Sequence, residues 1–149
     1  MKQPELPKNK YIRYALFGAV GYGAYKLIKA LFGSKVPTTP DAAAKDEKKF
    51  QSEGMKASYP DSQYSIFADS LYSAFIYWAG TDEKTIYSIM GKMNNNLDVA
   101  KLVKAFGTRR QEFTLMNYSL GAFITDELGT SEIANINKMF AAKKITYRF

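Results

Sequence analysis

Two pairs of adjacent carboxylates, Asp82/Glu83 and Asp126/Glu127, have the residue types that acid–base chemistry needs. Hydrolysis of a glycosidic bond uses two carboxyl groups that flank one substrate, one of them with a raised pKa. Side chains of neighbouring residues on a helix point about 100° apart, so neither pair faces a common substrate. Asp82 and Glu83 also suit the first turn of a helix, where the dipole favours acidic residues. The sequence therefore predicts no catalytic pair.

Cysteine and histidine are both absent from the 149 residues. Their absence excludes a disulfide framework, Ser–His and Cys–His nucleophile pairs, and zinc sites built on these ligands. We expect a protein that is not an enzyme and that has no cofactor and no metal site.

The formal net charge of +7 is concentrated in the first part of the chain. Residues 1–60 hold 11 Lys+Arg against 5 Asp+Glu, whereas residues 61–149 hold 10 against 9. Such a basic excess suits anionic lipid headgroups. Nucleic acid would attract the same charges, but no base-stacking or groove-reading motif accompanies them, so we do not expect it as a partner.

The element that must position these basic residues is the apolar segment 12–32, within an N-terminal region of residues 1–33. At about 1.5 Å per residue it matches a hydrocarbon core of about 30 Å, which predicts a transmembrane helix. Spanning requires Arg13, Lys26 and Lys29 to extend their side chains toward the interfaces. A helix lying on the membrane surface and a buried helix of a soluble fold are the alternatives.

Small residues form a stripe on this segment. Ala15, Ala19 and Gly23 recur every four residues, with Gly18 beside them. Another helix could pack closely there, including the same helix of a second copy, although small residues are also common in membrane helices generally. A cleaved signal peptide is disfavoured because no small-x-small site follows cleanly. Basic residues flank the segment on both sides, which leaves its orientation open.

Residues 34–60 are predicted to be a polar linker. Pro37 and Pro40 interrupt the chain after the first helix. Residues 41–52 fit a short polar helix with Asp41 as its N-cap and Phe50 as its one large hydrophobic residue. We interpret this mixed-charge segment as a spacer.

Residues 61–149 are predicted to form a compact domain of five short helices. Apolar residues at helical spacing recur in residues 67–78, 86–93, 99–106, 113–124 and 133–140. Gly80, Gly107 and Gly129 are expected to end helices, with Thr81 and Thr130 as N-caps of the following ones. The alternating tail 145–149 is expected to lie extended. The predicted fold class is all-α: a transmembrane helix, a linker and a five-helix domain.

Arg109 and Arg110 would begin the fourth of these helices, where the helix dipole disfavours cations. That position suggests contact with a partner's carboxylate or phosphate. Two solvated arginines are the alternative interpretation.

The motif WAGTDE at residues 78–83 resembles the loop between the first two helices of an annexin repeat. The similarity continues with Ile86 and Ile89, with the AF pair at 105–106 and with DEL at 126–128, and it covers residues 61–140. This resemblance implies a five-helix repeat that binds calcium through loop carbonyls and a distant carboxylate, and so docks on acidic lipid. The chain departs from the family at Trp78, which stands where a glycine is usual, and it carries a single repeat.

The whole layout resembles small virion proteins of bacteriophages, above all of tailless phages with an internal membrane. The likeness lies in the basic start, the helix ending in KLIKALFG, and the phrases GTDE, AFGTRR and DELGTSEIANIN. It implies a structural protein anchored in the virion's internal membrane, with its domain contacting capsid or vertex proteins. The alternatives are an interaction module anchored in a bacterial envelope and a calcium-dependent domain that binds acidic lipid.

Overall fold

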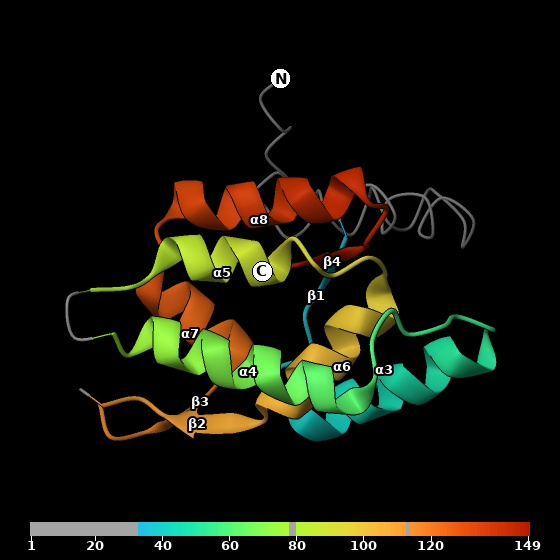
Figure 1. Ribbon diagram of the computed structural model, residues 1–149, viewed down its shortest axis with the longest axis horizontal. Helices are drawn as coiled ribbons and strands as arrows, with labels where there is room; N and C mark the ends of the chain where they lie inside the picture. The colour runs from blue at the N-terminus through green and yellow to red at the C-terminus, as the bar shows by residue number, and fades with distance from the viewer. Residues whose placement is uncertain (1–32, 78–79, 113) are drawn as a thin grey trace, which may run out of the picture. The chain divides into compact units, whose positions relative to one another are not determined.

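Six helices make up most of the chain that the computed structural model describes, which is residues 33–77, 80–112 and 114–149. The helices are α3 (Pro40–Ser52), α4 (Asp61–Phe75), α5 (Glu83–Met90), α6 (Asn96–Phe106), α7 (Leu120–Glu127) and α8 (Thr130–Ala142). Four short strands accompany them: β1 (Ser34–Lys35), β2 (Thr108–Arg110), β3 (Asn117–Ser119) and β4 (Tyr147–Arg148). Figure 1 shows their arrangement. The predicted predominance of helix is confirmed.

The predicted transmembrane segment, residues 12–32, lies outside the described residues. Within the part that is described, no helix combines the length and the apolar character that crossing a bilayer would need. The chain divides into two units, Met1–Ser34 and Lys35–Phe149, and the second holds all six helices.

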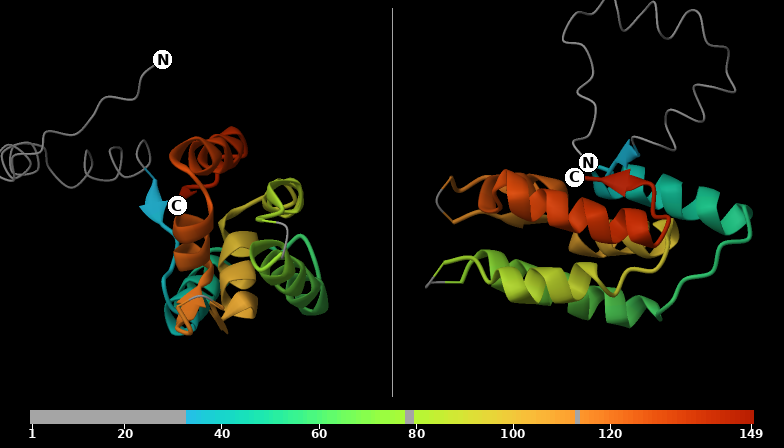
Figure 2. Two further views of the ribbon diagram at one scale, coloured as in Figure 1. Left: turned by 90° about the vertical axis from the view of Figure 1, so that its left-hand side faces the viewer. Right: turned by 90° about the horizontal axis from the view of Figure 1, so that it is seen from above.

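The segment predicted to be a linker contributes a helix to this second unit. α3 packs along α6, and Ala43, Glu47 and Phe50 are buried on its inner side (Figure 2). These three residues recur at positions i, i+4 and i+7, so they form a narrow stripe along the one side of the helix that is buried. The N-cap is Thr39 rather than Asp41, and its hydroxyl accepts the N–H of Ala42 at 3.2 Å.

α4, α5 and α6 follow the predicted periodicity. Three of the expected inner residues of α4, Phe67, Leu71 and Phe75, are buried, and the fourth, Trp78, lies outside the described residues. Asp82, not Thr81, is the N-cap of α5, because its Oδ1 accepts the N–H of Thr85 at 3.1 Å. Carboxylate caps of this kind satisfy an otherwise unpaired donor of the first turn.

The prediction of one long helix beginning at Thr108 or Arg109 is wrong. β2 and β3 form an antiparallel hairpin in which Arg109 lies opposite Tyr118, and the helix begins only at Leu120. Gly107 adopts φ +62°, ψ −131°, which turns the chain out of the helical path directly after α6. Met116, expected on the inner face of that helix, is exposed.

α8 begins after Gly129, whose residue type provides no capping side chain, so the predicted cap at Thr130 is wrong. Ile136 and Phe140 are buried as expected. The extended tail is confirmed: Tyr147 is buried, and the Arg148 carbonyl accepts the N–H of Val36 at 3.1 Å.

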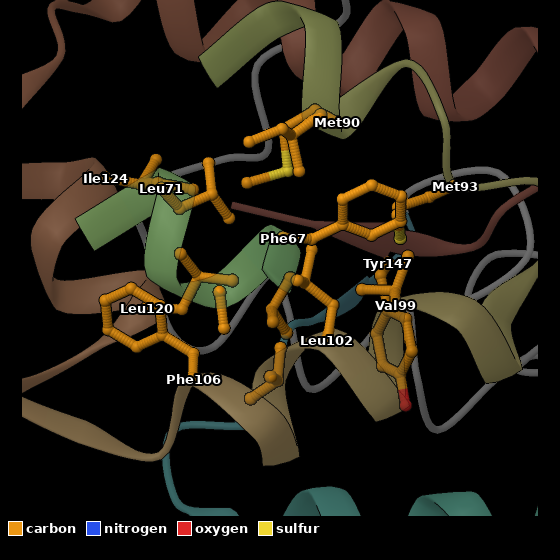
Figure 3. Packing of buried hydrophobic residues seen from close by; sticks show 14 of the residues in the cluster. Phe67, Leu71, Met90, Met93, Val99, Leu102, Phe106, Leu120, Ile124 and Tyr147 are labelled. Carbon is orange, nitrogen blue, oxygen red and sulfur yellow. The ribbon is translucent and has the colours of Figure 1, made fainter. Parts of the chain in front are cut away.

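The core lies where these helices meet, and Figure 3 labels ten of its side chains, from Phe67 to Tyr147. An aromatic group occupies its centre. Phe75 and Phe123 stack with ring centroids 5.2 Å apart, and Phe106 meets Phe123 edge-on at 5.7 Å. α4, α6 and α7 are therefore joined through Phe123.

Candidate functional site

The Arg109 side chain makes several contacts within the domain. Its Nη2 lies 2.7 Å from Oδ1 of Asp69, and its Nε donates to the carbonyl of Phe106 at 3.1 Å. The guanidinium also lies over the rings of Phe106 and Tyr72, with 5.1 and 5.3 Å to the centroids. Arg109 is in β2 and not at a helix start, so no helix dipole acts on it as expected, and its contact with a partner stays a prediction.

Arg110 is the next residue of β2 and is exposed. Its backbone carbonyl accepts a hydrogen bond from the Tyr72 hydroxyl at 2.9 Å. Of the two arginines, this one has its side chain at the surface. The predicted residues of membrane anchoring and helix packing lie outside the described residues: Arg13, Ala15, Gly18, Ala19, Gly23, Lys26 and Lys29.

The pair Asp82/Glu83 has a structural role in α5. Asp82 accepts both the backbone N–H and the hydroxyl of Thr85, and these bonds lower the pKa of its carboxyl. Glu83 is exposed in the first helical turn. A carboxyl group whose pKa is lowered is a poor general acid, so this pair gives no support to hydrolysis.

Asp126 and Glu127 lie at the end of α7 and meet two side chains from other segments. The amide of Gln111 donates to Oδ2 of Asp126 at 3.3 Å and to Oε1 of Glu127 at 3.2 Å. The Thr81 hydroxyl donates to Oε2 of Glu127 at 3.0 Å. The loop before α5, the hairpin and the end of α7 are thereby joined.

We call this region the loop end of the domain, defined by Tyr77, Gly80, Thr81, Asp82, Gln111, Glu112, Leu115, Met116, Asp126 and Glu127. In Figure 1 and in the right-hand view of Figure 2, the α4–α5 connection and the β2–β3 turn lie at the same end. A hollow of about 320 Å³ lies between these segments, lined by Phe75, Ile76, Tyr77, Gly80, Thr81, Gln111, Glu112 and Glu127. Its lining is partly aromatic and partly acidic.

A second hollow, of about 390 Å³, adjoins Tyr77 over the start of α5. Asp69 and Asp82 line it, together with Ser70, Ser73, Ala74 and Thr85. Tyr77 lines both hollows, so it lies next to Glu112 and Glu127 of the first and to Asp69 and Asp82 of the second.

A charged cluster that the sequence analysis did not identify joins α3 to α6. Lys101 Nζ lies 2.7 Å from Oε1 of Glu47 and 2.6 Å from Oδ1 of Asp61, while Lys104 Nζ lies 2.7 Å from Oε2 of Glu47. Burial alone would raise the pKa of Glu47, but the hydrogen bonds from Lys101 and Lys104 lower it overall. The one sign of this cluster in the sequence is Lys101, a charged residue among the apolar residues of α6.

Asp98 is fully buried and holds two loops in place. Its Oδ1 accepts the Ser58 N–H at 2.8 Å and the Tyr64 hydroxyl at 2.6 Å. Its Oδ2 accepts the Ser58 hydroxyl at 2.7 Å and the Asn94 N–H at 2.9 Å. Four donors surround this carboxylate, so its role is structural.

No metal site is evident in the described segments, where no three acidic side chains converge on a point that could hold an ion. Glu127, the α7 carboxylate that the Thr81 hydroxyl contacts, already accepts hydrogen bonds on both oxygens.

Comparison with known proteins finds no match for this chain among family models, curated protein sequences or solved structures. The resemblances to annexin repeats and to virion proteins stay predictions from the sequence.

Proposed function

We propose that this chain is a membrane-anchored structural protein of a virion, which tethers capsid or vertex proteins to an internal membrane. Residues 12–32 insert into the membrane, and Arg13, Lys26 and Lys29 reach its interfaces. The helical domain provides the protein-binding surface.

The observation that carries this proposal is the division of the chain into the apolar, basic-ended N-terminal part and a separate compact unit, Lys35–Phe149. The polar clusters of that unit join its own elements: Asp98 holds loops, Asp82 caps α5, and Glu47 binds α3 to α6. Binding through the surface is the role that such a domain supports best.

Calcium-dependent binding to acidic lipid is a second candidate, favoured by one contact. The Thr81 hydroxyl lies 3.0 Å from Oε2 of Glu127, which brings the annexin-like loop beside an acidic residue of α7. A calcium ion needs 6–8 oxygen ligands, and it would have to replace the hydrogen bonds that Glu127 now accepts.

Liposome flotation of the full chain, with an alkaline carbonate wash, tests the anchor. The matched control begins at Lys35, because a shorter chain that begins at Asp61 would lose α3 and its contacts with α6. Circular dichroism and a thermal melt of the control establish that it is folded. We expect only the full chain to float and to resist carbonate.

Each assay is run with calcium and with a chelator. Flotation of the Lys35 chain only with calcium would favour the second candidate, and a full chain that carbonate strips from the liposomes would refute the integral anchor. Co-purification of capsid proteins from detergent-treated particles would separate a virion protein from an envelope module of the same layout.

A further inference from the structure

Large apolar side chains are exposed at the loop end. Among the described residues, four large hydrophobic side chains are exposed, and three of them belong to this end: Tyr77 at 51%, Leu115 at 64% and Met116 at 63%. The fourth, Ile66, is on α4. Grouped exposed apolar residues mark interaction surfaces more often than scattered ones do.

The same end carries a negative charge in its two hollows. Glu112 and Glu127 line the first, Asp69 and Asp82 line the second, and neither lining includes a basic side chain. Arg109 pairs with Asp69 from outside the hollow. Lys84 and Arg110 are the basic residues on the adjoining described segments, and both are exposed.

Neutral donors hold two of these carboxylates in place. Thr81 and Gln111 orient Glu127, and Thr85 orients Asp82. Neutral donors fix the direction of a carboxylate without cancelling its charge, so each hollow keeps one oriented carboxylate, Glu127 in the first and Asp82 in the second.

We propose that the loop end docks a basic, apolar segment of a partner protein, with one Lys or Arg of that segment in each hollow on either side of Tyr77. The proposal rests on the proposed function of the domain as an interaction module and specifies the chemistry of its partner. Charge-assisted hydrogen bonds to the carboxylates orient the segment, and the Tyr77 ring contributes cation–π contact. Leu115 and Met116 contact its apolar side chains.

Charge complementarity selects this occupant over a lipid surface. Anionic headgroups would meet the carboxylates of Glu112, Glu127 and Asp82 at the same place as the apolar side chains, and like charges across an interface disfavour association. A positively charged protein segment meets opposite charge in both hollows.

The test uses the full chain in phosphatidylcholine nanodiscs and a fluorescein-labelled probe peptide of alternating leucine and lysine. Binding is measured by fluorescence anisotropy, with empty nanodiscs as the background. We expect saturable binding that weakens with added salt, and no binding of a probe with glutamate in place of lysine. Equal binding of both probes would overturn the proposal.

Variants then locate the site. Glu112→Gln and Tyr77→Ala are each expected to weaken probe binding about five- to tenfold, since a few residues dominate such interfaces. Ile66→Ala is the matched apolar control and Glu53→Gln, an exposed acidic residue just after α3, is the matched charge control; both should bind as wild type. Glu112 is exposed, so its substitution leaves the core intact.

Wild-type affinity in Glu112→Gln and Tyr77→Ala, or equal weakening in the two controls, would contradict the proposal. Displacement of the probe by micromolar calcium would contradict the proposal and would indicate that the loop end binds a metal ion. A full chain that does not insert into nanodiscs is assayed in solution, so failure of the anchor and failure of this site give separate results.

Discussion

Glu47 of α3 and Lys101 of α6 form an ion pair, with 2.7 Å between Oε1 and Nζ, although 54 positions separate them in the sequence. Each side chain is only 9% exposed. Asp61 at the start of α4 approaches the same ammonium group at 2.6 Å. Three helices therefore meet at one lysine, which fixes α3 as part of the domain.

Removal of the charge at Glu47 should destabilise the domain. Glu47→Gln leaves the buried Lys101 without its buried partner, and we expect a loss of about 2 kcal/mol in the free energy of unfolding. Urea denaturation measures it, with exposed Glu53→Gln as the control. A loss equal to that of the control would show that α3 does not depend on this pair.

The same ion pair predicts that the free energy of unfolding falls at acidic pH. The hydrogen bonds from the two lysines outweigh the effect of burial and hold the pKa of Glu47 below its ordinary value of 4.5. The stabilisation is fully present above the unfolded-state pKa and is lost as the pH falls through the lower, folded-state pKa. Urea titrations from pH 7 to 3 should show wild type and Glu47→Gln converging at low pH. A constant difference at every pH would be inconsistent with this account.

At alkaline pH, the contribution of Lys101 to stability changes in the opposite direction, since it falls as the pH rises. Burial opposes the shift, but hydrogen bonds to Asp61 and Glu47 raise the pKa of Lys101 above its ordinary value of 10.5. Its contribution to stability is present below that pH and is lost as the pH rises through the folded-state pKa. Lys101→Met should therefore lose less stability than wild type between neutral pH and pH 11. Parallel curves for the two proteins would argue against the shift.

Asp98→Asn is expected to lower the stability of the domain strongly, although the two side chains have nearly the same shape. Each carboxylate oxygen accepts one backbone N–H, from Ser58 on one side and Asn94 on the other. An amide group in either orientation would point its own N–H₂ at one of these donors. We expect a loss of about 3 kcal/mol, measured by thermal and urea unfolding. Tyr64→Phe, which removes a single donor, should lose less, and a reversed order would refute this reading of the network.

Truncation of Phe123 in the core should destabilise the protein far more than truncation of an exposed residue at the loop end. Phe123→Ala removes the ring that contacts Phe75 and Phe106, and we expect a loss of about 3–5 kcal/mol. Leu115→Ala, at an exposed position of the hairpin, should change the free energy of unfolding by about 0.5 kcal/mol or less. A large loss for Leu115→Ala would mean that this residue is packed and not available to a partner.

The sequence by itself determined the predominance of helix, the extended tail, and the inner faces of α4, α5 and α6. These follow from local rules: Phe67, Leu71 and Phe75 repeat at helical spacing, and the Asn residues before α6 supply its cap at Asn95. Such signals lie within a few positions of each other and need no knowledge of distant segments.

Only the tertiary structure decided the role of α3, the hairpin at Arg109 and the composition of the loop end. α3 looks polar because one of its three inner residues is Glu47, whose burial becomes favourable only when Lys101 and Lys104 lie opposite. Residues 108–119 look helical by periodicity, yet Gly107 turns the chain and Gln111 holds the hairpin against α7. Pairings between positions so far apart leave no periodic trace, because their energy depends on how the chain is folded.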